Sequence, residues 1–179
     1  KNTPSLTTHD FEDPNDQIMK AFKENDLLNR AEDKVKVIFS PVYLDGHDGL
    51  LGLNYYQAIS GCHFGVFPSY YEPWGYTPLE AAILGTPSVT SDLAGFGKFI
   101  QDEFPNEKNT GIFVLKRRKR SETQVINDLA EILHKFSNLT HRQRVTIKIK
   151  AQEQAFLADW RYLIKNYFKA YALACQKIS

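Results

Sequence analysis

The segment that decides the fold of this chain is Phe67-Pro68-Ser69-Tyr70-Tyr71-Glu72-Pro73-Trp74-Gly75-Tyr76-Thr77-Pro78-Leu79-Glu80. It follows an apolar run, residues 63–67, that is typical of a buried strand. Its second half predicts the start of a helix, with Thr77 as the N-cap, Pro78 at the first helical position and Glu80 completing a capping box. A strand, the glycine turn at Gly75 and a helix start together place backbone N–H groups where a phosphate can bind.

Two carboxylates, Glu72 and Glu80, flank this place in the segment. Taken alone, such a pair is better explained by a well-capped helix with two incidental acids. The rigid and bulky residue types between Pro68 and Pro78 are more numerous than a simple loop needs, which favours a binding site. We expect both carboxylates to face one open cleft at the carboxyl edge of a parallel sheet.

Composition limits the classes of protein to which the chain can belong. It has 179 residues, 42% of them hydrophobic, and a net charge of +1, so we expect one domain and no binding of nucleic acid by bulk charge. Two cysteines are too few for a disulfide framework and favour a cytoplasmic location. No apolar run reaches membrane-spanning length, so no membrane partner is expected. The start at Lys1, with no strand–glycine–helix unit near it, indicates a piece of a longer protein.

The remaining pattern alternates between strands and helices. Helices are predicted at residues 15–28, 54–60 and 78–84, strands at 35–39, 87–91 and 111–115, and a turn at Gly95-Phe96-Gly97. Gly85 is placed to end the third of these helices, and Pro87 blocks its extension. This spacing predicts βαβ units, and therefore an α/β fold with a parallel sheet covered by helices on both faces.

Two further helices are predicted after the last strand. Ser121 and Thr140 each begin a capping-box pattern, with Gln124 and Gln143 three residues later. We expect one long helical segment over residues 140–178. Both helices carry apolar stripes that we expect to face the core, at Val125, Ile126, Leu129, Ile132, Leu133 and Phe136 and at Phe156, Trp160, Leu163, Ile164, Tyr167 and Tyr171.

Two polar clusters are weaker signals. The basic run Lys116-Arg117-Arg118-Lys119-Arg120 can grip phosphates, although a solvated face is the more common role of such a run. His47 lies between Asp45 and Asp48 in a turn-rich loop, but the three lack the spacing of metal ligands, so no metal site is predicted.

With these residues laid out, the chain resembles the C-terminal, donor-binding part of an animal/fungal-type glycogen synthase, a retaining GT-B glycosyltransferase. The core Tyr-Tyr-Glu-Pro-Trp-Gly-Tyr-Thr-Pro at residues 70–78 is specific, whereas the two glutamates alone would indicate only a retaining GT-B enzyme. Other matching stretches are Thr8-His9, residues 33–39 and 61–69, Gly95-Phe96-Gly97, Arg117-Arg118 and Asp159-Trp160.

The resemblance implies a fold and a reaction. The fold is two Rossmann-like domains with the nucleotide sugar between them, and this chain would be a partial nucleotide-sugar-binding domain over residues 1–179. The reaction is transfer of glucose from UDP-glucose to the 4-hydroxyl of a glycogen chain end with retained configuration. It requires no cofactor or metal. The acceptor domain lies outside the chain, so this piece alone is expected to be inactive, and the full-length enzyme can be a homo-oligomer.

The resemblance also implies roles for residues of the central segment. Glu72 would lie at the glucosyl ring as the catalytic charge-stabilising group, and the amides of Gly75, Tyr76 and Thr77 suit the diphosphate. Because the departing UDP is an anion, electrostatic stabilisation is expected to dominate catalysis.

Recognition of the nucleoside is expected to involve two more residues. Glu80 would hold the ribose hydroxyls, and Tyr55 matches the position that stacks on the base. The side chains of Trp74 and Tyr76 are expected to support the loop, and His63 is expected to have a structural role.

A regulatory phosphate site is implied on the helix after Thr140. Eukaryotic members of the family bind glucose 6-phosphate there with several arginines, and the matching bases in this chain are Arg142, Arg144, Lys148 and Lys150. Lysine lacks the planar fork of arginine, and Glu153 adds a repelling charge, so we expect weak or absent activation by this ligand. The same bases are also explained by simple solvation of one side of the helix.

Two alternatives to the glycogen synthase assignment stay open at this point. Another retaining GT-B transferase with a different donor shares the paired glutamates. A non-catalytic nucleotide-sugar-binding or regulatory module can keep the fold without turnover, although retention of both Glu72 and Glu80 counts against it.

Overall fold

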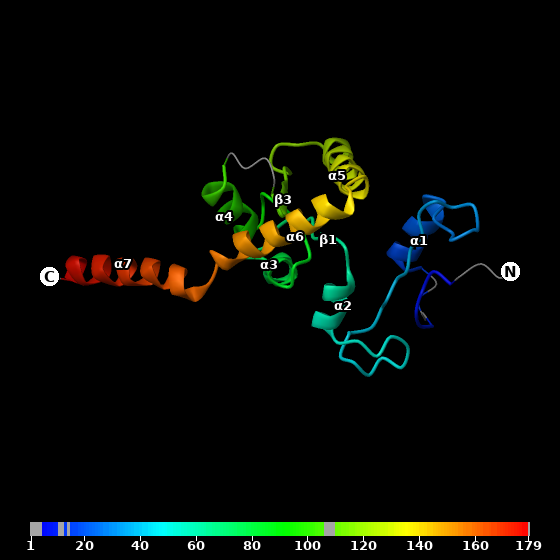
Figure 1. The fold of residues 1–179 in the computed structure, drawn as a ribbon, viewed down its shortest axis with the longest axis horizontal. Coiled ribbons are helices and arrows are strands. Elements are labelled where there is room, and N and C mark those ends of the chain that lie inside the picture. The colour runs from blue at the N-terminus through cyan, green and yellow to red at the C-terminus, as the bar shows by residue number, and fades with distance from the viewer. Residues whose placement is uncertain (1–4, 11–12, 14, 106–109, 179) are drawn as a thin grey trace. The chain divides into compact units, whose positions relative to one another are not determined.

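The structure, a computed structural model, describes residues 5–10, 13, 15–105 and 110–178 (Figure 1). The chain divides into two compact units, residues 1–58 and 59–179. Among the described residues of the first unit, only Asn29 is buried. The hydrophobic clusters of the chain therefore lie in the second unit.

The first helix is shorter than the predicted one. Helix α1 spans Gln17–Glu24, and the side chain of its N-cap, Asp16, accepts a hydrogen bond from the Met19 N–H at 2.9 Å. Two residues after the helix, Asp26 has a φ of +56°, which is outside the helical range. The chain therefore turns before reaching the predicted end at residue 28.

The strand predicted at residues 35–39 is wrong. The side-chain amide of the buried Asn29 replaces a neighbouring strand: its Nδ2 donates to the Val37 carbonyl at 2.8 Å, and its Oδ1 accepts from the Val37 N–H at 2.8 Å. Only Phe39 forms a bridge, with Thr7. The apolar alternation has no core to face, since Val35 and Ile38 are exposed.

Helix α2, Tyr55–Gly61, confirms the short helix predicted at residues 54–60. Asn54 and Gln57 cap its start reciprocally, with the Gln57 N–H donating to the Asn54 side chain at 3.0 Å and the Asn54 N–H to the Gln57 side chain at 2.9 Å.

The sheet confirms the predicted α/β fold class. Its parallel strands are β1 (Gly65–Val66), β2 (Ser88–Ser91) and β3 (Ile112–Leu115), in the spatial order β1-β2-β3. Gly65 pairs with Ser88, and Ser88 pairs with Ile112. Because the strands are parallel and adjacent, their carboxyl ends lie at one edge of the sheet.

Helices cover both faces of the sheet. Along β3, Ile112 and Val114 pack into one cluster with residues of α3, α4 and α6, while Phe113 and Leu115 pack into another with α5. Successive strand side chains point to opposite faces, so one strand joins both layers. This two-layer covering explains why every residue of the central strand β2 is buried.

Helix α3, Tyr76–Ile83, begins earlier than predicted. Its N-cap is Gly75, with a φ of +105°, and no side chain caps it, so the assignment of Thr77 and Glu80 to a capping box is wrong. The predicted end is confirmed. Gly85 has a φ of +77°, and the N–H groups of Gly85 and Thr86 donate to the carbonyls of Ala82 and Ala81 at 2.9 and 2.8 Å, which is a Schellman cap.

The glycine pair predicted as a turn is instead the first turn of a helix. Helix α4, Gly95–Glu103, starts with Gly95-Phe96-Gly97. The ring of Phe96 is fully buried in the cluster that α3, α4 and α6 share. The apolar side chain between the glycines is what anchors this helix to the sheet.

Helix α5, Glu122–Ser137, has the predicted capping box at Ser121. Its buried or half-buried side chains, Val125, Leu129, Ile132 and Phe136, lie on one face. Ile126 and Leu133 are exposed, so the stripe that reaches the core is narrower than predicted.

The long helical segment expected over residues 140–178 is two helices. Helix α6, His141–Phe156, has the predicted capping box at Thr140, and α7, Trp160–Ile178, follows a break at residues 157–159 (Figure 1). The expectation that the second stripe faces the core is wrong, because Trp160, Tyr167 and Tyr171 are exposed. Among the described residues, no helix is long and apolar enough to span a membrane.

One close contact between α6 and the sheet gives a stability prediction. A Cβ added at Gly111 would lie 2.1 Å from the Ala151 backbone nitrogen in α6. Gly111→Ala should therefore lower the free energy of unfolding by about 2–3 kcal/mol, because α6 must move away from β3. Urea denaturation measures this. The control is Gly61→Ala, where an added Cβ meets no atom within 4 Å; equal effects in both variants would contradict the argument.

Candidate functional site

The candidate site is built where the chain leaves the three strands. The Arg117 backbone N–H, after β3, donates to Oδ1 of Asp92, after β2, at 2.8 Å. The Arg117 guanidinium donates to the carbonyl of Pro68, after β1, at 3.0 Å. Ser91 Oγ donates to the Ser69 carbonyl at 2.6 Å. Hydrogen bonds thus join all three strand ends, and the segment after β1 is held against the other two.

The segment that carries Glu72 is held by its backbone. The Glu72 N–H donates to the Leu93 carbonyl at 3.3 Å, the Gly95 N–H to the Glu72 carbonyl at 3.0 Å, and the Phe96 N–H to the Trp74 carbonyl at 2.7 Å. A Cβ added at Gly95 would lie 2.2 Å from the Pro73 carbonyl oxygen, so only glycine permits this approach. These bonds use only the backbone of Glu72, and its side chain lines the cavity described below.

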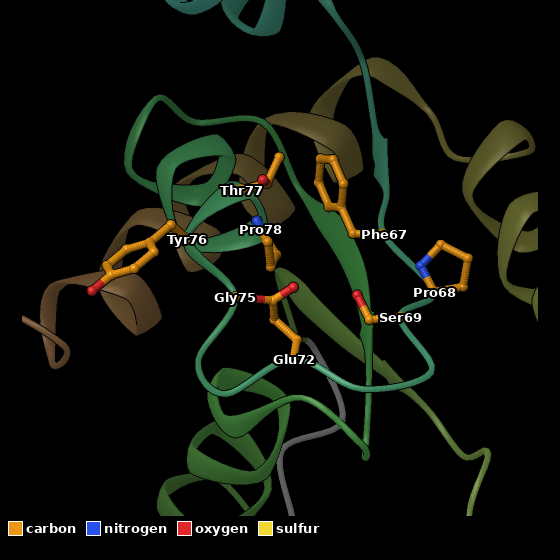
Figure 2. Close-up of a pocket in the computed structure, with 8 residues that line it drawn as sticks. All are labelled: Phe67, Pro68, Ser69, Glu72, Gly75, Tyr76, Thr77 and Pro78. Carbon is orange, nitrogen blue, oxygen red and sulfur yellow. The ribbon is translucent and has the colours of Figure 1, made fainter.

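The Trp74 ring packs against α4 and supports this segment, as predicted. Its centroid lies 5.7 Å from that of Phe96 and 5.7 Å from that of Phe99, both on α4. The expectation that the Tyr76 side chain also supports the loop is wrong. Its ring is 69% exposed, and Figure 2 shows it pointing away from the other labelled side chains.

A cavity of about 400 Å³ lies between the end of β1 and the start of α3. The structure brings four of the predicted site residues, Glu72, Gly75, Tyr76 and Thr77, to this cavity (Figure 2). Its other lining residues are Phe67, Pro68, Ser69 and Pro78. The sequence placed these in the central segment but gave them no role; their position after a buried strand was the available signal.

The start of α3 makes one side of this cavity attractive to an anion. The first turn of a helix leaves backbone N–H groups without intrahelical partners, and the helix dipole adds partial positive charge there. An ideal Cβ at Gly75 would lie 3.4 Å from Glu72 Cγ, so the carboxylate-bearing side chain lies directly beside the helix start. The cavity therefore combines an anion-attracting surface with a single nearby carboxylate.

Glu80 and Tyr55 are not brought to this cavity. Since α3 begins at Tyr76, Glu80 lies a full turn along the helix and does not line the cavity, contrary to the expectation that both glutamates face one cleft. Tyr55 belongs to the first unit of the chain.

Arg117 is a site residue whose role the sequence did not reveal. Its guanidinium lies 3.7 Å from the centre of the Tyr70 ring, and its side chain is only 8% exposed. The Tyr70 hydroxyl donates to Glu122 at 2.7 Å, at the start of α5. A solvated face is thus wrong for Arg117, whereas Arg118 and Lys119 are exposed.

The predicted phosphate-binding bases on α6 separate into two groups. Arg144 and Lys148 line a cavity of about 200 Å³ together with His63 and His141. Arg142 does not line it, and neither does Lys150, which forms an ion pair with Glu153 at 2.9 Å. The structure therefore assembles a smaller basic cluster than the sequence predicted.

The loop around His47 has a structural explanation. Asp48 Oδ1 accepts hydrogen bonds from the N–H groups of Leu50, Leu51 and Gly52 at 2.8, 2.8 and 3.1 Å. These bonds, that of Leu50 first, lower the pKa of Asp48. Among the described residues, no group of three or more His, Cys, Asp or Glu side chains is arranged to hold a metal ion.

Similarity to known proteins identifies the family of this chain. A family model described as glycogen synthase matches residues 1–179. The chain belongs to the glycogen synthase family. It is 39% identical over 177 residues to glycogen (starch) synthase isoform 1 of Saccharomyces cerevisiae. The matched region covers 97% of this chain and 25% of the yeast protein.

Animal glycogen synthases give the same result. The chain is 37% identical over 175 residues to the Caenorhabditis elegans protein, covering 98% of this chain and 26% of the relative. It is 40% identical over 168 residues to the human liver protein, covering 93% and 24%. The chain thus spans about a quarter of the length of these glycogen synthases.

Arg117 gives a test of how the strand ends are held together. Arg117→Met keeps an unbranched side chain but removes the guanidinium, with its bond to the Pro68 carbonyl and its contact with the Tyr70 ring, so the free energy of unfolding should fall by about 2 kcal/mol. The exposed neighbour offers a matched control, since Arg118→Met should change it by less than about 0.5 kcal/mol. Chemical denaturation of both variants measures the difference. If the two substitutions cost the same, Arg117 does not hold the site together.

Proposed function

We propose that the full-length protein containing this chain is a glycogen synthase that transfers glucose from UDP-glucose to the 4-hydroxyl of a glycogen chain end, with retained configuration. This chain supplies part of the donor-binding domain. The acceptor domain is supplied by the rest of the protein, and the enzyme acts in the cytoplasm, as cysteine usage predicts.

One observation carries the proposal: the Glu72 side chain lies beside the start of α3 in a cavity at the carboxyl edge of a parallel sheet. Ligands of α/β sheets bind at this edge. Family membership adds the reaction class, because the relatives named above are glycogen synthases.

The geometry matches the charges that develop during transfer. The bond from the glucose anomeric carbon to the UDP oxygen breaks as the bond to the acceptor oxygen forms, and the acceptor hydroxyl passes its proton to the departing phosphate oxygen. Before that proton arrives, negative charge grows on the diphosphate and positive charge on the sugar ring. The N–H groups of Gly75, Tyr76 and Thr77 and the α3 dipole stabilise the diphosphate. Glu72 stabilises the positive ring. Groups that are already oriented before the reaction need little reorganisation.

Donor recognition completes the proposal. Glu80 accepts hydrogen bonds from the ribose hydroxyls one helical turn away from the diphosphate, and the Tyr55 ring stacks on the base. The α3 register supports the role of Glu80, because one turn along the helix is about 5 Å, which suits the separation of a ribose from its phosphate.

The chain alone should be inactive. The N–H groups at the start of α3 supply partial charges, whereas a diphosphate carries full negative charges that need basic side chains. Of the described lining residues of this cavity, none is a lysine or an arginine. The cations that neutralise UDP therefore come from parts of the protein outside this chain.

A substitution in the full-length enzyme tests the catalytic role of Glu72. Glu72→Ala should lower kcat by about 100- to 1,000-fold with little change in folding, because a charge beside the reacting sugar is lost. Glu80→Ala should instead raise the KM for UDP-glucose and leave kcat within a few-fold.

The control for these variants is Glu103→Ala, an exposed carboxylate at the end of α4. It should leave both constants unchanged. A Glu72→Ala enzyme that turns over at a near wild-type rate with saturating donor would remove Glu72 from catalysis and favour a non-catalytic nucleotide-sugar-binding module.

Regulation by glucose 6-phosphate is a second part of the proposal. The cavity of His63, His141, Arg144 and Lys148 has one arginine, and lysine and histidine cannot grip a phosphate with a planar fork. Activation should therefore be weak or absent. The test is the rate of the full-length enzyme with and without the ligand. Strong, saturable activation that disappears in Arg144→Ala but persists in Arg142→Ala would contradict this expectation.

A further inference from the structure

Ser69 lines the proposed donor cavity, and the backbone on both sides of its Cα is held in place. Before the Cα, the Ser69 N–H donates to the Phe67 carbonyl at 2.9 Å, and the Pro68 carbonyl of the same peptide group accepts from Arg117 at 3.0 Å. After it, the Ser69 carbonyl accepts from Ser91 Oγ at 2.6 Å. Because both flanking peptide groups are bonded, the direction in which the Ser69 side chain leaves the backbone is fixed.

The same hydrogen bonds turn backbone carbonyls away from the cavity. Neither Arg117 nor Ser91 is among its described lining residues, so the Pro68 and Ser69 carbonyl oxygens that they bind point out of it. The Phe67 carbonyl is occupied as well, by the Ser69 N–H, and the Phe67 N–H is bonded to β2. A free carbonyl oxygen in this wall would repel the negative groups of a nucleotide sugar. The polar group that this wall offers to a ligand is therefore the Ser69 hydroxyl.

The Ser69 hydroxyl is available to such a ligand. The residue is half-buried, and no hydrogen bond joins its hydroxyl to any other residue that the structure describes. A serine hydroxyl both donates and accepts hydrogen bonds, as a sugar hydroxyl does, so the two groups match.

The neighbourhood of Ser69 favours the sugar of the donor over its phosphates. Glu72, three residues further along the same segment, also lines the cavity, and its negative charge disfavours a phosphate. In the view of Figure 2, the Glu72 side chain lies between Ser69 and Gly75, the N-cap of α3. The diphosphate is proposed to bind at that helix start, so Ser69 belongs to the other end of the cavity.

We propose that Ser69 is a further substrate-binding residue, whose hydroxyl donates to a hydroxyl of the transferred sugar. Ser91 and Arg117 are positioning residues, which act through the backbone of residues 68 and 69. This assignment rests on the proposed function, since it takes the sugar of a nucleotide sugar to lie beside Glu72. It makes Ser69 a determinant of sugar specificity, because a sugar that lacks the contacted hydroxyl leaves the serine without a partner.

The first test removes the hydroxyl from the full-length protein. Ser69→Ala should raise the KM for UDP-glucose about three- to tenfold, which is roughly what one neutral hydrogen bond contributes. Free UDP has no sugar, so its inhibition constant should stay within about twofold of wild type. The control is Ser137→Ala, an exposed serine at the end of α5 that does not line the cavity, and it should change neither constant.

The second test removes hydroxyls from the donor. In a series of UDP-deoxyglucoses that each lack one sugar hydroxyl, wild type should lose kcat/KM with the analogue that lacks the contacted group. Ser69→Ala should lose about three- to tenfold less with that analogue alone. Equal losses in both proteins for every analogue would overturn the proposal. So would a rise in the UDP inhibition constant parallel to that in the KM for UDP-glucose, because it would place Ser69 at the nucleotide.

Ser91 is tested through its partner. Ser91→Ala should raise the KM for UDP-glucose, and by a smaller factor in the Ser69→Ala background, because part of its effect passes through the Ser69 hydroxyl. Thr86→Val is the matched control: Thr86 is buried just before β2, and its hydroxyl donates to the Ile59 carbonyl at 2.9 Å. It should lower stability without changing this KM. Equal factors for Ser91→Ala in both backgrounds would contradict the positioning role.

Failure of the proposed function looks different. A wild-type protein that transfers no glucose from UDP-glucose contradicts the transferase assignment. An active wild-type enzyme whose Ser69→Ala variant keeps its KM for UDP-glucose contradicts only the role of Ser69.

Discussion

The site depends on one close approach between two pieces of backbone. Residues 72–74 lie directly on the first turn of α4, which is possible because residue 95 has no side chain, and the absence of a side chain at residue 97 lets the same turn lie against the end of β2. An added Cβ would meet the Pro73 carbonyl oxygen at 2.2 Å in one case and the Ser91 carbonyl oxygen at 2.0 Å in the other. Phe96, between these glycines, is buried and anchors the turn. The position of Glu72 thus follows from the packing of α4 against the sheet.

Charge organises the neighbouring loops in a similar way. The Arg117 guanidinium donates to the Pro68 carbonyl, stacks on the Tyr70 ring and lies 3.9 Å from the Glu122 carboxylate. A planar cation can satisfy an acceptor in its plane and a ring on its face at the same time, which lysine cannot do. This residue therefore links the end of β1 to the start of α5. The loop that carries the site is held from both sides, by backbone pairing at residue 72 and by Arg117 at residues 68 and 70.

Features encoded by neighbouring residues were predictable from the sequence, and features that depend on distant partners were not. The caps at Ser121, Thr140 and Gly85 are local, and the structure has all three. The apolar run at residues 35–39 had the pattern of a strand, but Asn29 takes the backbone bonds of Val37. Similarly, the apolar stripe from Phe156 to Tyr171 repeats at helical spacing, but its Trp160, Tyr167 and Tyr171 are exposed. The spacing of apolar residues predicts a helix but not which surface covers its apolar face.

The candidate site shows the same division. Four lining residues come from one short segment, so they must lie close together in any fold: Glu72, Gly75, Tyr76 and Thr77. The separation of Glu80 from them depends on where α3 begins, and Gly75 starts the helix through its positive φ although Thr77 is the better capping residue by type. With α3 starting at Tyr76, Glu80 lies four residues into the helix and is not among the residues that line the cavity. The two carboxylates therefore lie at different places along α3 and the segment before it, and only Glu72 lines the cavity.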